Sequence, residues 1–121
     1  MKLTIDMPWE KDLSVNQMRF GAGGGYRKKP HVQAWMGRCA YEVALARPVP
    51  HRIKLPVRAL IYFRYPDRRR RDDHNAYKIL CDCIASGLGI DDQHIRISTG
   101  SVTVDGKNPG FTIEVSDETE Q

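Results

Sequence analysis

The segment RRRRDDHNAYKILCDCIASGLGIDDQHI, residues 68–95, sets positive charge directly against carboxylates. Four arginines run into Asp72 and Asp73, and a second aspartate pair, Asp91 and Asp92, follows the next apolar run. Carboxylates beside an arginine block would repel a phosphate unless a divalent cation bridged them, and Mg²⁺ takes carboxylate oxygens while it keeps water. The arrangement therefore predicts a metal-dependent site that cleaves phosphodiesters.

A helix is predicted over residues 73–86, capped by one of the two aspartates at its start and stopped by Gly87 and Gly89. Within it, His74, Lys78 and Asp82 recur every fourth residue and so share one face. Lys78 can stabilise the charge that grows on an attacked phosphorus. The neighbouring Asp82 can either fix the lysine ammonium or form an ordinary surface ion pair with it.

The second aspartate pair raises a geometric question. A helix of about fourteen residues is roughly 20 Å long, which would place Asp91 near the end that is far from Asp72. Either the loop GLGIDD turns back along the helix, or a second subunit of a two-fold dimer supplies its own pair. The sequence leaves both arrangements open.

Phosphate-binding residues are expected next to the acidic groups. The arginine run adjoins them, and the segment GAGGGYRKKP ends in basic residues that can hold a nucleic-acid backbone. Its small residues from Gly21 to Gly25 predict a mobile loop, and a floppy hairpin tip without a role in DNA binding is an equal alternative to a grip on the backbone. The expected DNA contacts are Arg64, Arg68, Arg69, Arg70, Arg71, Arg27, Lys28 and Lys29.

Charge is divided unevenly along the chain. The formal net charge is +4, but residues 1–78 carry 17 Lys and Arg against 7 Asp and Glu, whereas residues 79–121 carry 2 against 8. A strongly basic part of this kind suits a polyanion, so the distribution favours a nucleic-acid partner.

Composition also limits the class of protein. The hydrophobic content of 40% and the charged content of 28% are ordinary for one globular domain, which we expect over residues 1–121. No apolar run is long enough to cross a membrane, and no secretory signal is expected at the start. Three cysteines without framework spacing favour a reducing cytoplasm.

The elements that must position these residues are strands and helices that alternate along most of the chain. The predicted fold class is α+β, with a mixed sheet of about four strands packed with two main helices in the order strand-helix-strand-helix-strand-strand. The expected elements are strands over 3–7, 53–65, 94–105 and 109–115 and helices over 31–46 and 73–86.

Details of packing follow from single residues. Pro56 suggests an edge or a bulge in its strand, and Trp35 is expected in the core. The last two strands are expected to form an antiparallel pair around Asp105 and Gly106. The tail over residues 116–121 is expected to fray.

The stretch YPDRRRRDDHNAYKILCDCIASGLGIDDQHI resembles the signature of RusA-type Holliday junction resolvases, small dimeric enzymes encoded by phages and prophages. Their pattern is a Pro-Asp-arginine run, then Asp-x-Asp-Asn-x-x-Lys, a further helix aspartate, and Asp-Asp after a glycine-bearing turn. The resemblance implies a RusA-like intertwined or two-fold homodimer in the bacterial host cytoplasm. It also implies Mg²⁺- or Mn²⁺-dependent, symmetric nicking of four-way DNA junctions in recombination or repair.

The resemblance also assigns roles to single residues. The implied catalytic residues are Asp72, Lys78 and Asp92, the implied metal ligands are Asp72, Asp91 and Asp92, and the supporting residues are Asn75 and Asp82. We add His74 to both the catalytic residues and the candidate ligands, because it occupies a position within the motif.

One position departs from the family pattern, because His74 stands where the motif has its second aspartate. Imidazole is a poorer ligand for Mg²⁺ than carboxylate but suits Mn²⁺. Alternatively, His74 orients or deprotonates the attacking water. Asp73 offers a third way to replace the lost charge, although a shift of one residue turns a side chain about 100° around a helix.

Two other functions are weighed against junction resolution. A non-catalytic module would bind branched DNA with strong salt dependence and never nick it. A nuclease that prefers forks or flaps would cut those substrates in place of four-way junctions. All three take branched DNA as the partner and need neither a membrane nor a small-molecule cofactor.

Overall fold

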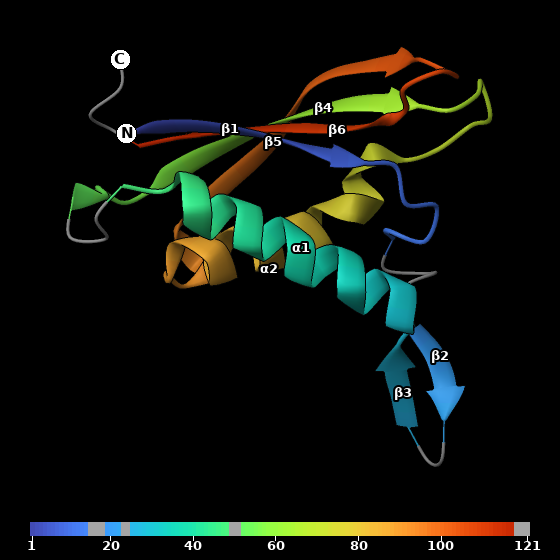
Figure 1. Cartoon of the computed structure of the whole chain (residues 1–121), viewed down its shortest axis with the longest axis horizontal. Coiled ribbons are helices and arrows are strands. Elements are labelled where there is room, and N and C mark those ends of the chain that lie inside the picture. Colours follow the sequence, from blue (N-terminus) through green and yellow to red (C-terminus); the bar gives the residue numbers. More distant parts are fainter. Residues whose placement is uncertain (15–18, 23–24, 49–51, 118–121) are drawn as a thin grey trace.

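The described residues of this computed structural model are 1–14, 19–22, 25–48 and 52–117, and within them four strands form one mixed sheet in the order β1-β6-β4-β5. Figure 1 shows the helices α1 and α2 packed on one face of this sheet. The strands are β1 Lys2–Pro8, β2 Arg19–Ala22, β3 Gly25–Lys28, β4 Val57–Tyr65, β5 Ile95–Val104 and β6 Gly110–Ser116. The helices are α1 Pro30–Ala46 and α2 Tyr77–Leu88, with 3₁₀ turns η2 Asp73–Ala76 and η3 Asp92–His94.

The predicted α+β fold with a mixed sheet and two helices is therefore confirmed. β6 pairs antiparallel with both β1 and β4, and Ser116 lies opposite Lys2 on one side and Arg58 on the other. β4 pairs parallel with β5, with Val57 opposite Ile95. The parallel pair is possible because α2 makes the crossover between the two strands.

The predicted antiparallel pair of the last two strands is wrong, because β4 lies between β5 and β6. β4 buries every second residue along its whole length, whereas β5 exposes its second half. The most apolar strand, β4, therefore lies in the interior of the sheet, and the turn at Asp105 and Gly106 connects β5 to β6 across β4. Pro56 does not mark an edge either, because it precedes the first strand residue and its missing N–H costs no ladder bond.

Trp35 belongs to the core as predicted. Its side chain is 7% exposed, and its Nε1 donates a hydrogen bond to the Pro8 carbonyl over 2.8 Å. The ring packs edge-on against Phe111 of β6, which joins α1 to the sheet. Burial of an aromatic side chain of this kind contributes about 2–3 kcal/mol.

Helices α1 and α2 approach each other closely at Gly87. A Cβ atom at this position would lie 2.5 Å from the Cβ of Val43 and 2.6 Å from the Ala40 carbonyl oxygen. The helix therefore continues through Gly87, where the sequence predicted a stop. It ends at the second predicted glycine, Gly89, whose φ of 72° gives a left-handed C-cap.

The glycine-rich segment, predicted as a mobile loop, contributes to a hairpin. β2 and β3 pair antiparallel from Arg19 opposite Lys28 to Ala22 opposite Gly25, and residues 23–24 lie outside the described part. In Figure 1 this hairpin extends away from the sheet at the start of α1. The segment thus belongs to a hairpin, as one of the sequence interpretations expected, and its role in DNA binding stays a prediction.

The end of the described chain is anchored. Ser116 belongs to β6, and Asp117, 4% exposed, accepts a hydrogen bond from the Lys54 backbone N–H over 3.0 Å. The Met1 amino group donates to the same carboxylate. The remainder of the tail that was predicted to fray, residues 118–121, lies outside the described residues. Across the described residues, no helix combines the length and apolar character that crossing a bilayer requires.

Candidate active site

Asp72 caps the turn that begins the predicted motif. Its Oδ1 accepts the backbone N–H of His74 over 3.0 Å, and its carbonyl accepts that of Asn75 over 3.1 Å. The cap prediction is confirmed, but the turn is 3₁₀ and α-helix begins only at Tyr77. Because a 3₁₀ turn has three residues per turn, His74 does not continue the helical row of Lys78 and Asp82.

A hydrogen-bond chain ties this turn to β5. The Tyr77 hydroxyl bonds to Thr99 Oγ1, and Thr99 donates to the carboxylate of Asp73. The His74 ring stacks on the Tyr77 ring with centroids 4.7 Å apart. These contacts therefore hold His74 and Tyr77 in the turn that follows Asp72, and the Asp73 carboxylate is bonded to β5.

Lys78 contacts the helix aspartate and one member of the second aspartate pair of the motif. Its Nζ lies 3.1 Å from Asp82 Oδ1 and 3.4 Å from Asp92 Oδ2. After the left-handed turn at Gly89, the loop turns back so that Asp92 reaches Lys78 of α2 within the same chain. The hydrogen bond to Asp82, with help from Asp92, raises the pKa of Lys78 and keeps its ammonium charged.

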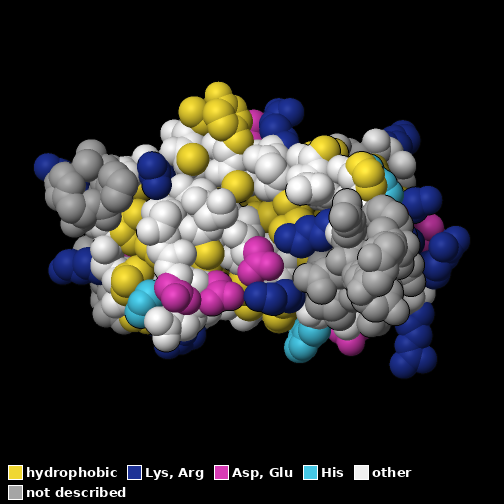
Figure 2. All heavy atoms as spheres, turned by 90° about the horizontal axis from the view of Figure 1, so that it is seen from below, with side chains coloured by type: hydrophobic (Ala, Val, Ile, Leu, Met, Phe, Trp, Pro, Cys, Tyr) yellow, Lys and Arg dark blue, Asp and Glu magenta, His cyan; other side chains and the backbone are white. Residues whose placement is uncertain are grey.

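Asp91 caps the second 3₁₀ turn. Its Oδ1 accepts the Gln93 backbone N–H over 3.0 Å, and this bond, together with a contact to Asp92, lowers the pKa of Asp91. The side chains of Asp72, Asp91 and Asp92 are all exposed. Asp72 and Asp91 are thus each held by a backbone N–H through one carboxylate oxygen, and all three side chains remain exposed. Figure 2, which views the helix side, shows acidic side chains gathered together with basic side chains nearby.

A pocket of about 310 Å³ opens beside Asp72. Arg71 forms part of its wall, with its guanidinium carbon 5.2 Å from the Trp9 ring centroid and 5.1 Å from that of Tyr65. The lining residues are Trp9, Glu10, Lys11, Leu13, Ser14, Tyr65, Arg70, Arg71, Asp72, Asn75 and Phe111.

The predicted DNA-binding arginines divide into two kinds. Arg68, Arg69 and Arg70 are exposed, and Arg70 also lines the pocket beside Asp72. Arg71 is instead held by the Asp67 carboxylate at 2.9 Å and by the two aromatic rings. A guanidinium that is held in this way supports the pocket wall.

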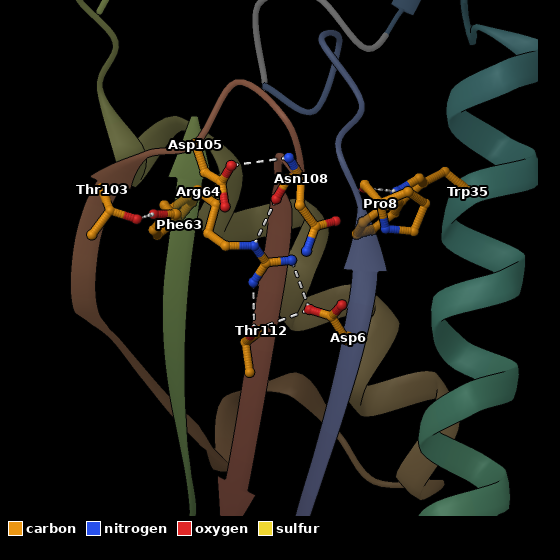
Figure 3. Close-up of polar contacts among 9 residues, drawn as sticks. All are labelled: Asp6, Pro8, Trp35, Phe63, Arg64, Thr103, Asp105, Asn108 and Thr112. Atoms are coloured by element: carbon orange, nitrogen blue, oxygen red, sulfur yellow. Dashed lines mark hydrogen bonds and ion pairs between the residues drawn. The ribbon is translucent and has the colours of Figure 1, made fainter. Parts of the chain in front are cut away.

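Arg64 is also committed to contacts within the chain, on strand β4. Figure 3 shows its guanidinium bonded to Asp6 at 2.8 Å, to Thr112 Oγ1 at 2.6 Å and to the Asn108 carbonyl at 3.0 Å. The residue therefore ties β4 to β1 and to the segment before β6.

The basic residues before α1 are spread over three environments. Lys29 forms an ion pair with Asp12 at 3.5 Å. Lys28 lines a groove of about 380 Å³ between α1 and α2 that also includes Asp82. The backbone of Arg27 belongs to β3, and its side chain lies outside the described part.

A different acidic cluster has the tightest spacing. Among the described residues, the group of three candidate metal ligands whose atoms lie within 4.8 Å of one another is Glu10, Asp12 and His31. The four predicted ligands (Asp72, His74, Asp91 and Asp92) are described, and no three of them meet this spacing. The cluster has no sequence signal, because it joins the loop after β1 to the start of α1.

The comparisons with known proteins agree with the motif. The family model for endodeoxyribonuclease RusA matches residues 13–116, which span both 3₁₀ turns, Lys78 and the exposed arginines. A search of curated proteins gave no match. Enzymes of the RusA family are Holliday junction endonucleases and use a divalent metal ion. The resemblance carried by residues 65–95 is thus confirmed over most of the chain, and the chain belongs to the RusA endodeoxyribonuclease family.

Proposed function

We propose that this chain nicks four-way DNA junctions with Asp72, Asp91 and Asp92 as ligands of Mg²⁺ or Mn²⁺. The observation that carries the proposal is the contact between Lys78 and Asp92, 3.4 Å apart, which brings the second acidic pair of the motif back to its lysine within one chain. Exposed carboxylates suit a hard cation, and Mg²⁺ in such sites takes one or two carboxylates together with substrate phosphate and water. The bound ion would supply Lewis-acid stabilisation of the attacked phosphate.

The side chains around the carboxylates divide the remaining work. Lys78, held charged by Asp82, stabilises negative charge on the phosphate. His74 completes the ligand set or orients the attacking water, and its stacking on Tyr77 fixes the plane of its ring. Arg68, Arg69 and Arg70 bind the flanking phosphates, because their exposed guanidinium groups adjoin Asp72.

The proposal extends to the assembly and the setting. Two nicks placed symmetrically across a junction require two active sites, so we propose a homodimer with one site in each subunit. The contact between Lys78 and Asp92 favours sites completed within one subunit. Branched DNA of this kind arises in recombination and repair, and we propose that the enzyme acts in a bacterial cytoplasm, in a phage or prophage setting.

A synthetic four-way junction tests the proposal. We expect symmetric nicks with Mg²⁺ or Mn²⁺ and none after Asp72→Asn, because the substitution removes a charged ligand. Glu42→Gln is the matched control, since Glu42 makes a surface pair with Arg38 on α1. Salt-sensitive binding without nicking under either metal would overturn the proposal in favour of a non-catalytic module. Faster cleavage of forks or flaps would replace the four-way junction as the substrate.

A further inference from the structure

Strand β5 has an exposed outer edge. In the described part of the chain it ends the sheet, because β4 is its partner on one side and no strand pairs with the other. Residues Ser101 to Val104 are exposed on both faces, whereas β1, at the opposite end of the sheet, buries every second residue. No charged side chain occurs from Ile97 to Val104. Natural proteins usually protect such an edge with charge, proline or a covering segment.

The pairing with β4 fixes the side to which the exposed valines point. Val102 lies opposite Phe63 and Val104 opposite Tyr65, and both aromatic residues are buried. Paired residues point to the same face, so the two valines lie on the face that the helices cover. They are nevertheless 50% and 51% exposed, because they extend beyond that cover. An uncovered apolar strip therefore runs along this edge.

A bulge at Gly100 sets the register of this strand. Ile61 pairs with Thr99 and Tyr62 with Ser101, which leaves Gly100 as the extra residue. A Cβ atom at Gly100 would lie 2.6 Å from the Tyr62 ring, so glycine is required there. Beyond the bulge, Ser101 faces away from the helices and Val102 faces toward them.

We infer that β5 pairs antiparallel with β5 of a second copy of this chain, around a two-fold axis at Ser101. Counting past the extra Gly100, this register places Thr99 opposite Val102 and Ile97 opposite Val104, all on the helix-covered face. Each contact occurs twice in a two-fold interface, and the two sheets become continuous. The apolar strips of the two copies then cover each other.

Charge complementarity favours a second copy of this chain as the partner of β5 and favours antiparallel pairing. In the same register Arg96 of one copy lies opposite Asp105 of the other, so an ion pair closes each end of the uncharged segment. Arg96 now donates to the Gln93 carbonyl, and its guanidinium has further donors. Parallel pairing would bring like charges together at each end. The link between this interface and paired nicking rests on the proposed function, whereas the pairing itself does not.

A disulfide test reports on the register directly. Ser101→Cys would place two thiols opposite each other at the axis, so mild oxidation should yield a covalent dimer on a non-reducing gel. Thr103→Cys is the matched control, because it lies on the same face but opposite Ser98, and it should not cross-link. The parent chain measures the background from Cys39, Cys81 and Cys83. Cross-linking of both variants alike, or of neither, would overturn the register.

The oligomeric state in solution tests whether the exposed edge of β5 is a dimer interface. Sedimentation should show a dimer that Val102→Lys converts to a monomer with an unchanged circular dichroism spectrum. Arg96→Asp should weaken the dimer at least several-fold, and the double variant with Asp105→Arg should restore it. A chain that is monomeric at micromolar concentration, or a dimer that survives Val102→Lys, would overturn the inference. A cross-linked Ser101→Cys dimer that cuts no junction would instead contradict the proposed function and leave the interface standing.

Discussion

Two acidic groups in this protein are built in opposite ways. In the Glu10 cluster (Glu10, Asp12 and His31), His31 Nε2 lies 2.6 Å from Asp12 Oδ2 and 3.1 Å from Glu10 Oε1, and the Lys29 ammonium lies 3.5 Å from Asp12 Oδ2. The Asp12 side chain is only 12% exposed. The cluster therefore joins the loop after β1 to the start of α1, with its charges met by neighbouring side chains.

The motif site (Asp72, Asp91, Asp92 and Lys78) is open by comparison. Asp72 and Asp91 are held by backbone N–H groups at the start of 3₁₀ turns, and their carboxylates are exposed. Lys78 is shared between Asp92 and Asp82. Negative charge therefore exceeds positive charge around this lysine. We therefore expect the cation at the motif site and not at the Glu10 cluster, although the ligand atoms of the Glu10 cluster are more closely spaced.

The largest expected difference between the two groups is in catalysis. Asp92→Asn should slow single-turnover junction nicking by at least about 100-fold, because several kcal/mol of charge stabilisation depends on the ion. Asp12→Asn should leave the rate per folded molecule unchanged. Quench-flow measurements at saturating enzyme compare the two variants. A rate loss confined to Asp12→Asn would move the metal site to the Glu10 cluster.

The histidine of the motif site offers a second comparison. His74→Asp should raise the ratio of nicking in Mg²⁺ to nicking in Mn²⁺ by on the order of tenfold, because carboxylate oxygen suits Mg²⁺ better than imidazole does. Parallel metal titrations of the variant and parent chain measure this ratio. His31→Asp in the Glu10 cluster is the control and should leave it unchanged. An unaltered ratio in both variants would assign His74 to the attacking water.

The effects of the two substitutions on stability should rank in the opposite order to their effects on catalysis. Asp12→Asn should lower the free energy of unfolding by about 1–3 kcal/mol, because it weakens charged hydrogen bonds to His31 at a poorly exposed site. Asp92→Asn, at an exposed site, should change it by less than about 0.5 kcal/mol. Urea unfolding followed by circular dichroism gives both values. Equal losses would show that Asp92 is also a structural residue.

The smallest expected effect is a pH dependence that Asp12 contributes. Burial raises its pKa, but the hydrogen bond from His31 and the charges of Lys29 and His31 together lower it below the ordinary value of 3.8. Because the folded-state pKa is the lower one, the stabilisation is present above 3.8 and is lost as pH falls through the folded-state value. Urea midpoints between about pH 6 and about pH 3 should fall more steeply for the parent chain than for Asp12→Asn. Parallel curves would contradict this.

The sequence predicted those features that depend on local patterns. Alternation predicted β1, apolar periodicity predicted α1, and residue type predicted a cap at Asp72 or Asp73. The pairing of β5 could not be predicted, because the turn after Val104 is compatible with a hairpin and the central place of β4 depends on competition for burial across the whole sheet. Gly87 had the chemistry of a helix stop, and contact with α1 overrides it.

The candidate site divides in the same way. The motif spacing predicted the acidic and basic residues, and the contact of Lys78 with Asp92 showed how the loop returns. Spacing could not separate Arg71, which supports the pocket wall, from the exposed arginines before it, because their difference lies in the rings of Trp9 and Tyr65. The Glu10 cluster could not be predicted from spacing either, because its residues come from segments that are separated in the sequence.

The contact at Gly87 links helix packing to the distance between reactive groups. Since no side-chain carbon fits between α2 and Val43 there, the separation of the helix axes is set by backbone contact. Lys78 and Asp82 lie on the same rigid helix, so their height above the sheet is fixed by a residue that bears no side chain. A methyl group added at this point would lift the whole helix, and homologues with alanine there should need a smaller residue on α1 to keep the same catalytic spacing.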